Sequence, residues 1–181
     1  QILYDFTWSD FCDWYIELTK SALHSDDADK KDNAVSVLLF VLENTLKLLH
    51  PFIPFITDEI YRSLPDTKGS IMVADYPRYN SKLAYKKEAA AFGGVMEIIK
   101  AIREVKVETG CAPSKKVNVY LVSESKRLIS ANADCIAKLA GASGVRVIAS
   151  KEEAEEKCVA KVTGIGTLYI PLGELVDADK E

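Results

Sequence analysis

The sequence predicts an α+β protein in which a helical bundle, residues 1–113, is followed by a small α/β subdomain, residues 114–173. Apolar residues recur at helical spacing through most of the first 108 positions. A proline-containing corner near residue 51 breaks this pattern in two. From Val117 onward the composition changes to short β-branched and aromatic runs separated by glycine, which is typical of strands. Residues 174–181 read as the start of a further helical arm.

Size and composition exclude several classes of protein. The chain has 181 residues, of which 48% are hydrophobic, so it is long enough to bury a core. It has no apolar run of about 18 residues and no signal-peptide pattern, and we therefore expect a cytoplasmic protein without a membrane span. The four cysteines and two histidines lack metal-binding spacing, so no metal site is predicted. The absence of an initiator Met and of a linker predicts a piece of a longer chain.

The first predicted helix, Trp8 to Lys20, has one wide apolar face at i, i+3 and i+4 spacing. Trp14 falls outside that stripe, and it is the aromatic residue that we expect to be most available to a partner. A charged break follows at residues 25–32, and it contains Lys30 and Lys31.

The next predicted helix starts at Asp32 and ends at Leu49, because Pro51 cannot continue it. Pro54 fits the first turn of a new helix, which ends near Leu64. The residues of the corner are so apolar that we expect it to be buried. His50 is expected to be a hydrogen-bonded structural residue.

A long helix is predicted from residue 80 to about 108, with Gly110 as its stop. The remainder gives a β-α-β-β order. Strands are predicted at residues 117–122 and 145–149, with helical sequence between them. A hairpin follows at residues 158–162 and 167–170.

The charge distribution points to a local basic patch. The net charge is -4, and residues 151–181 account for all of it with eight acidic and four basic side chains. Residues 100–116 carry five bases against two acids. Within this patch Arg103 and Lys106 lie near one another on the helix, and Lys115 and Lys116 follow in the connector. Such groups can hold phosphate oxygens, although a solvated helix face is the alternative.

No catalytic residues are predicted. The sequence has no glycine-rich phosphate loop, and its neighbouring carboxylates lie near helix starts, where they compensate the helix dipole. No cofactor is therefore expected in this chain.

Residues 48–61, Leu-Leu-His-Pro-Phe-Ile-Pro-Phe-Ile-Thr-Asp-Glu-Ile-Tyr, resemble a signature of the anticodon-binding domain of class I aminoacyl-tRNA synthetases for aliphatic amino acids. Residues 4–17 and 102–117 are similar specifically to valyl-tRNA synthetases. Two details depart from that pattern: Cys111-Ala112-Pro113 stands where Val-Pro-Pro is usual, and Lys106 replaces an arginine.

The resemblance implies an N-terminally truncated anticodon-binding bundle that recognises the anticodon stem and loop of valine tRNA, and it implies no contact with DNA. Its tRNA-binding candidates are Lys115, Lys116, Arg103, Lys106, Lys30, Lys31 and Trp14. The resemblance also implies a larger, monomeric enzyme whose missing catalytic domain uses ATP to ligate valine to its tRNA.

Two alternatives stay open from the sequence. One is a helical protein–protein interaction module that uses Trp14 and the acidic tail. The other is the equivalent domain of an isoleucyl- or leucyl-tRNA synthetase. Salt-dependent binding to tRNA would distinguish an anticodon-binding domain from a protein–protein interaction module. The effect of a changed anticodon on that binding would distinguish a valyl domain from an isoleucyl or leucyl one.

Overall fold

The computed structural model describes residues 1–154 and 157–175, and they divide into two compact units, residues 1–81 and the described residues from 82 onward. The α+β class is confirmed, because helices occupy the first part and a small mixed sheet the second. The compact units divide earlier than the predicted boundary at residue 113, and the long helix belongs to the second unit. The predicted domain limits stay predictions, and residues 176–181 of the predicted arm lie outside the described residues.

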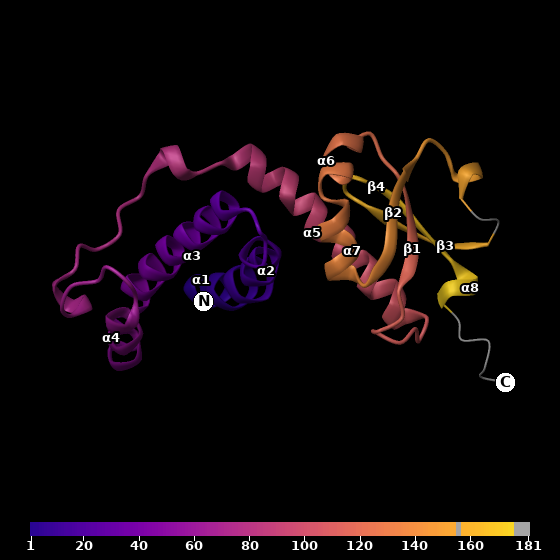
Figure 1. Ribbon diagram of the computed structural model, residues 1–181. Coiled ribbons are helices and arrows are strands. Elements are labelled where there is room, and N and C mark those ends of the chain that lie inside the picture. The colour runs from indigo at the N-terminus through magenta and orange to yellow at the C-terminus, as the bar shows by residue number, and fades with distance from the viewer. Residues whose placement is uncertain (155–156, 176–181) are drawn as a thin grey trace. The chain divides into compact units, whose positions relative to one another are not determined.

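The first unit consists of helices (Figure 1), and its core lies where two of them meet. Leu46, Tyr61 and Ile71 are buried together there, and Leu42, Ile60, Leu64 and Ala74 pack around them. Its helical segments are α1 (Ile2–Asp5), a π-helix (Phe6–Ile16), α2 (Glu17–Leu23), α3 (Ala28–Leu49), α4 (Pro54–Ser63) and a 3₁₀ turn (Ile71–Val73).

At the proline corner the two helices end and begin where they were predicted to, but the corner is not buried as predicted. Helix α3 ends at Leu49 and α4 begins with Pro54 at its first turn. His50 Nδ1 lies 2.8 Å from Thr57 Oγ1, so the expectation of a hydrogen-bonded histidine is confirmed. The expectation of a buried corner is wrong, because Phe52, Ile53, Phe55 and Ile56 are exposed, Phe55 to 91%. Of the residues around the corner, Thr57, the partner of His50, is buried.

One carboxylate, Asp58 on α4, fixes the loop that follows this helix. Its Oδ1 accepts hydrogen bonds from Ser70 Oγ at 2.8 Å and from the Ile71 amide at 2.9 Å. Its Oδ2 accepts from Arg62 Nε at 2.7 Å. These donors, the Ile71 amide above all, lower the pKa of Asp58 from 3.8 to about 2. The loop is thereby held so that Ile71 reaches the core.

The second unit is a four-stranded sheet in the order β2-β1-β4-β3, covered by helices. Strands β1 and β2 are parallel, and β1–β4 and β3–β4 are antiparallel, which confirms the β-α-β-β order. Strand β2 starts at Ala142, three residues before the strand that was predicted at residues 145–149. The elements are α5 (Lys86–Glu108), β1 (Val117–Val122), α6 (Lys126–Ala131), α7 (Ala133–Ala140), β2 (Ala142–Ile148), β3 (Cys158–Thr163), β4 (Gly166–Pro171) and α8 (Leu172–Leu175).

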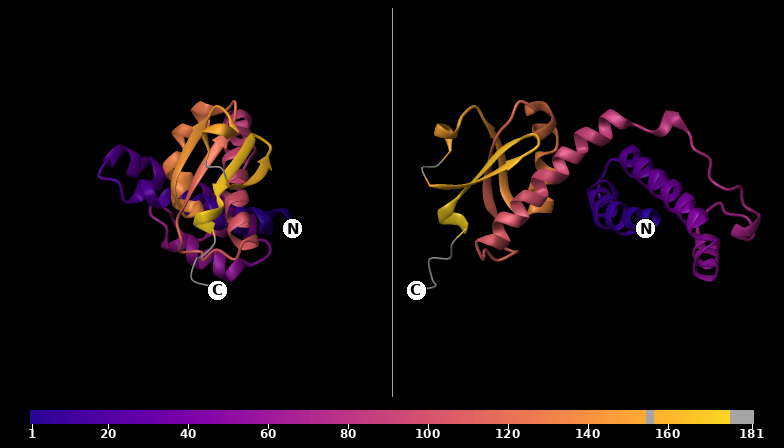
Figure 2. Two further views of the ribbon diagram at one scale, coloured as in Figure 1. Left: turned by 90° about the vertical axis from the view of Figure 1, so that its right-hand side faces the viewer. Right: turned by 180° about the vertical axis from the view of Figure 1, so that it is seen from behind.

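Helix α5 crosses the sheet diagonally (Figure 2) and contacts α7 and β3, while α7 contacts β2. Alternate residues of β1, namely Val117, Val119 and Leu121, are buried on the helix-covered side. Lys161, which shares a row with Leu121, bonds Glu108 of α5 at 3.0 Å on the same side. In the part of the chain described here, no helix is both long and apolar enough to span a bilayer.

The anchoring of the loop by Asp58 predicts how the first unit responds to acid. Because the folded pKa of this carboxyl lies below its ordinary value, its stabilisation is complete above about pH 4 and is lost as the pH falls through about 2. Asp58→Ala should therefore lower the melting temperature at pH 7 and remove part of the acid dependence. Tryptophan fluorescence measures this unit alone, since Trp8 and Trp14 both lie in it.

The matched control is Asp75→Ala, which removes an exposed carboxylate from the same loop. Equal melting temperatures for the two variants at pH 7 would show that Asp58 does not hold the loop.

Candidate nucleic-acid interface

The predicted aromatic contact, Trp14, is buried, with 9% of its surface exposed. The prediction that it faces a partner is therefore wrong. The residues from Phe6 to Ile16 form a π-helix, whose i→i+5 hydrogen bonds make wider turns than the 3.6-residue period on which the prediction was based. Phe11 and Trp14 thus face inward, Tyr15 stacks on Phe11 with ring centroids 6.1 Å apart, and Trp8 is exposed instead.

Lys30 and Lys31 are exposed at the start of α3, but their surroundings are acidic. Asp27 caps this helix by accepting from the Lys30 amide at 3.2 Å, and Lys30 Nζ lies 3.2 Å from its Oδ2. These contacts with Lys30 lower the pKa of Asp27. Residues 25–32 contain four acids and two bases, a local charge of -2. This disfavours the pair as a phosphate contact.

Lys106, predicted to lie on a basic surface, is instead 4% exposed in the last turn of α5. Its ammonium donates to three backbone carbonyls: those of Pro113 at 3.1 Å, Lys115 at 2.7 Å and Gly141 at 3.2 Å. These three bonds use all three donors of the group. A direct phosphate contact by Lys106 is thus contradicted, because no donor remains and the side chain is covered.

Gly141 makes the close approach of Lys106 possible. It follows α7 in the left-handed conformation, with φ of +64°, which ends the helix. A Cβ atom at this position would meet Lys106 Nζ at 3.0 Å. The ammonium therefore lies against the carboxyl end of α7, where the helix dipole favours a positive charge.

Arg103 binds the same end of α7 from one turn earlier on α5. Its Nε and Nη2 donate to the Leu139 carbonyl at 3.0 and 2.7 Å. Unlike Lys106, it is exposed. It borders a hollow of about 420 Å³ whose lining includes the exposed Lys138, a cation that the sequence analysis missed. Lys138 is distant from Arg103 in the chain, and only the packing of α7 on α5 brings the two residues to one site.

The connector between α5 and β1 has a fixed backbone. The Cys111 amide donates to the Lys106 carbonyl at 2.8 Å and the Gly110 amide to that of Val107 at 3.1 Å, with Gly110 at φ of +67°. This pair of bonds is the Schellman end of a helix. The ammonium group of Lys106 then donates hydrogen bonds to the carbonyls of Pro113 and Lys115. The connector consequently presents Lys116 exposed and Lys115 half-buried at the start of the sheet.

The structure thus leaves a group of three predicted cations: Arg103 at the rim of the hollow, and Lys115 and Lys116 on the connector that Lys106 holds. The positive side chains at the rim of the hollow and on the connector can contact phosphate oxygens, and they would do so without reading bases. Lys30, Lys31 and Trp14 belong to the first compact unit and are not part of this group.

The thiol of Cys135 lies half-buried on α7. Burial raises the pKa of Cys135 on α7, which keeps its thiol protonated and poorly nucleophilic. Within residues 1–154 and 157–175, no three His, Cys, Asp or Glu side chains are grouped so that they could hold a metal ion.

Comparison with known proteins gives a consistent set of matches. A family model described as the anticodon-binding domain of tRNA ligase matches residues 1–121. Valine–tRNA ligase of Clostridium acetobutylicum is 40% identical over 183 residues, and that of Clostridium tetani 41% over 184 residues; each alignment covers 100% of this chain and 21% of the relative. Valine–tRNA ligase of Staphylococcus aureus (strain JH9) is 35% identical over 99% of the chain. The chain spans about a fifth of the length of these relatives.

The structural role of Lys106 predicts a local loss of stability when its ammonium is removed. Lys106→Met leaves three carbonyls without their donor, and an unsatisfied buried group costs about 1–3 kcal/mol. We expect unfolding of the second unit to become at least about 2 kcal/mol easier. Hydrogen exchange should rise in the connector and at the end of α7, while peptides from residues 1–81 serve as the internal reference.

Lys100→Met, which changes an exposed lysine of the same helix, is the matched control. If Lys106→Met exchanges no faster than this control in residues 110–117, the ammonium does not hold the connector.

Proposed function

Because the chain belongs to the family of anticodon-binding domains of tRNA ligases, we propose that it binds the anticodon stem and loop of valine tRNA as part of a larger valine–tRNA ligase. The family match over residues 1–121 carries this proposal. The names of the relatives that align over the whole chain support valine as the amino acid.

The group of cations on the second unit provides a physical basis for holding RNA. Arg103 and Lys138 are exposed at the rim of the hollow, and the connector carries the exposed Lys116 and the half-buried Lys115. In this proposal they contact phosphates of the stem, which sets the position of the RNA but does not distinguish one anticodon from another. Bases of the loop would be recognised by stacking and by hydrogen bonds to their edges, the mode that single-stranded RNA allows.

The chemistry of the larger ligase belongs to other parts of it in this proposal. The ligase joins valine to its tRNA with the use of ATP, and this chain contributes binding without a cofactor of its own. A cytoplasmic setting and a monomeric ligase are part of the same proposal. The family match and the names of the relatives disfavour both alternatives, a protein–protein module and the corresponding domain of an isoleucyl or leucyl enzyme.

The proposal predicts that Lys115→Ala with Lys116→Ala weakens binding to valine tRNA by a similar factor whatever the anticodon. Loss of phosphate contacts should also reduce the dependence of log Kd on log salt by about 1 for each contact. The measurement is a titration of labelled valine tRNA, and of the same tRNA with a changed anticodon, at two salt concentrations.

Lys126→Ala, at an exposed lysine of α6, is the control for a simple change in net charge. A loss confined to one anticodon would contradict the phosphate role of Lys115 and Lys116. Failure of the unmodified chain to bind either tRNA at low salt would contradict the proposed function.

A further inference from the structure

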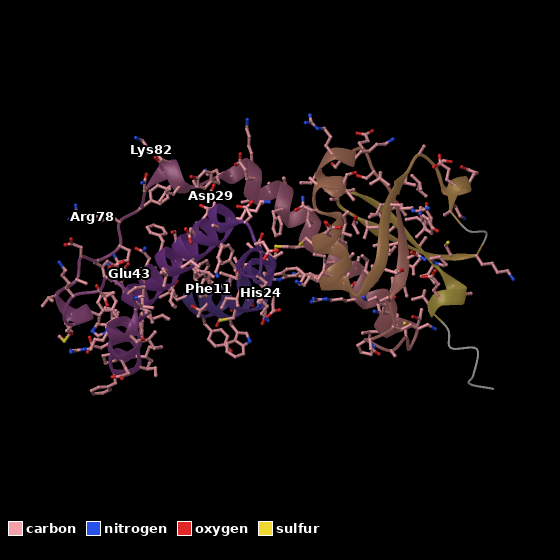
Figure 3. The ribbon with its side chains drawn as sticks, in the orientation of Figure 1. Phe11, His24, Asp29, Glu43, Arg78 and Lys82 are labelled. Carbon is pink, nitrogen blue, oxygen red and sulfur yellow. The ribbon has the colours of Figure 1, made fainter. Side chains whose placement is uncertain are left out.

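The segment from Tyr76 to Lys87 combines charges and aromatic rings in a way that the proposed site does not use. Its twelve consecutive residues, Tyr-Pro-Arg-Tyr-Asn-Ser-Lys-Leu-Ala-Tyr-Lys-Lys, contain four bases and no acid. The chain as a whole carries a net charge of -4, and Asp75 and Glu88 border this basic run. All four basic residues, Arg78, Lys82, Lys86 and Lys87, are exposed, and Figure 3 shows Arg78 and Lys82 extending outward from the ribbon.

The three tyrosines of this segment are exposed as well. Tyr76 is 59% exposed, Tyr79 84% and Tyr85 62%. An aromatic ring in a connecting segment ordinarily gains stability by packing into a core. Three rings are thus left open to solvent within ten residues, and each has a base one or two positions away.

The backbone of the segment keeps these side chains accessible. Residues 74–80 have no helix or strand, residues 81–83 form a 3₁₀ turn, and α5 begins at Lys86. Tyr85, the residue before α5, has φ of +38°, a conformation that bulky residues rarely adopt. Strain of this kind is often retained where it serves a binding site. The twelve residues are consecutive in the chain, with residues 76–81 at the end of the first unit and residues 82–87 at the start of the second.

We propose that residues 76–87 bind single-stranded RNA, with bases stacked on Tyr76, Tyr79 and Tyr85 and phosphates paired with the neighbouring basic side chains. Positive charge along the backbone path together with open aromatic rings is the combination by which proteins hold single strands without reading sequence. The inference rests on the proposed function for its natural ligand, the unpaired nucleotides of a tRNA loop. An acidic peptide could use the charges, but it would gain nothing specific from stacking on the rings.

The test uses the 181-residue chain with two probes, labelled oligouridylate and labelled valine tRNA. Tyr79→Leu keeps an apolar side chain but removes the ring, and Tyr79→Phe keeps the ring. We expect Tyr79→Leu to weaken oligouridylate binding at least about fivefold and Tyr79→Phe to bind as the parent chain does. Tyr4→Leu, at a tyrosine that is 64% exposed in α1, is the matched control and should change nothing.

Charge is tested separately by Arg78→Gln. For a phosphate contact to a single strand, the slope of log Kd against log salt should fall by about 0.7, while Lys126→Gln leaves it unchanged. A polyglutamate peptide serves as the competitor that offers charge without bases, and it should compete poorly with oligouridylate.

The outcomes distinguish the stacking site at residues 76–87 from the proposed function of the whole chain. Binding of valine tRNA that is indifferent to Tyr79→Leu, Tyr76→Leu and Tyr85→Leu overturns the inference and leaves the proposed function intact. Oligouridylate binding that needs the tyrosines, without any binding of valine tRNA, supports the segment and contradicts the proposed function. If oligouridylate does not bind, or polyglutamate displaces it as well as unlabelled RNA does, the stacking site does not exist.

Discussion

A single ammonium group, that of Lys106, connects the parts of the second compact unit. It donates to the connector at Pro113 and Lys115 and to the end of α7 at Gly141, and it does so from the last turn of α5. The Gly141 carbonyl lies far from the other two in the sequence, and one side chain binds all three with every donor in use. The position of the exposed basic side chains around the connector follows from this arrangement. In the proposed function, Lys106 therefore contributes to RNA binding only through the backbone that it holds.

Lys106 and its neighbours show that basic residues that are close in the sequence need not share one surface in the fold. Residues 100–116 look like one basic patch when they are read as a string. In three dimensions Lys106 is buried, Arg103 binds a helix end, and Lys138 joins the site from α7. The net effect is a different set of cations from the one that the sequence indicates. Such a set suits a few phosphate contacts that position an RNA.

Local chemistry made much of the fold predictable, and long-range packing explains most of the errors. Pro51 and Pro54 define where α3 ends and α4 begins, and β-branched runs define the strands. Burial of Trp14 was missed because a π-helix changes which residues share a face. Burial of Lys106 was missed because its acceptors come from a later helix and from the connector. The exposed corner at Phe55 was missed because apolarity alone does not say what covers a residue.

In the proposed function this chain binds the anticodon arm of a tRNA. Hydroxyl-radical footprinting of valine tRNA with the 181-residue chain shows where on the RNA the protein lies. We expect protection of the anticodon stem and loop, with the acceptor stem as reactive as in free tRNA. Protection centred on the acceptor stem, or no protection at concentrations that saturate binding, would contradict it.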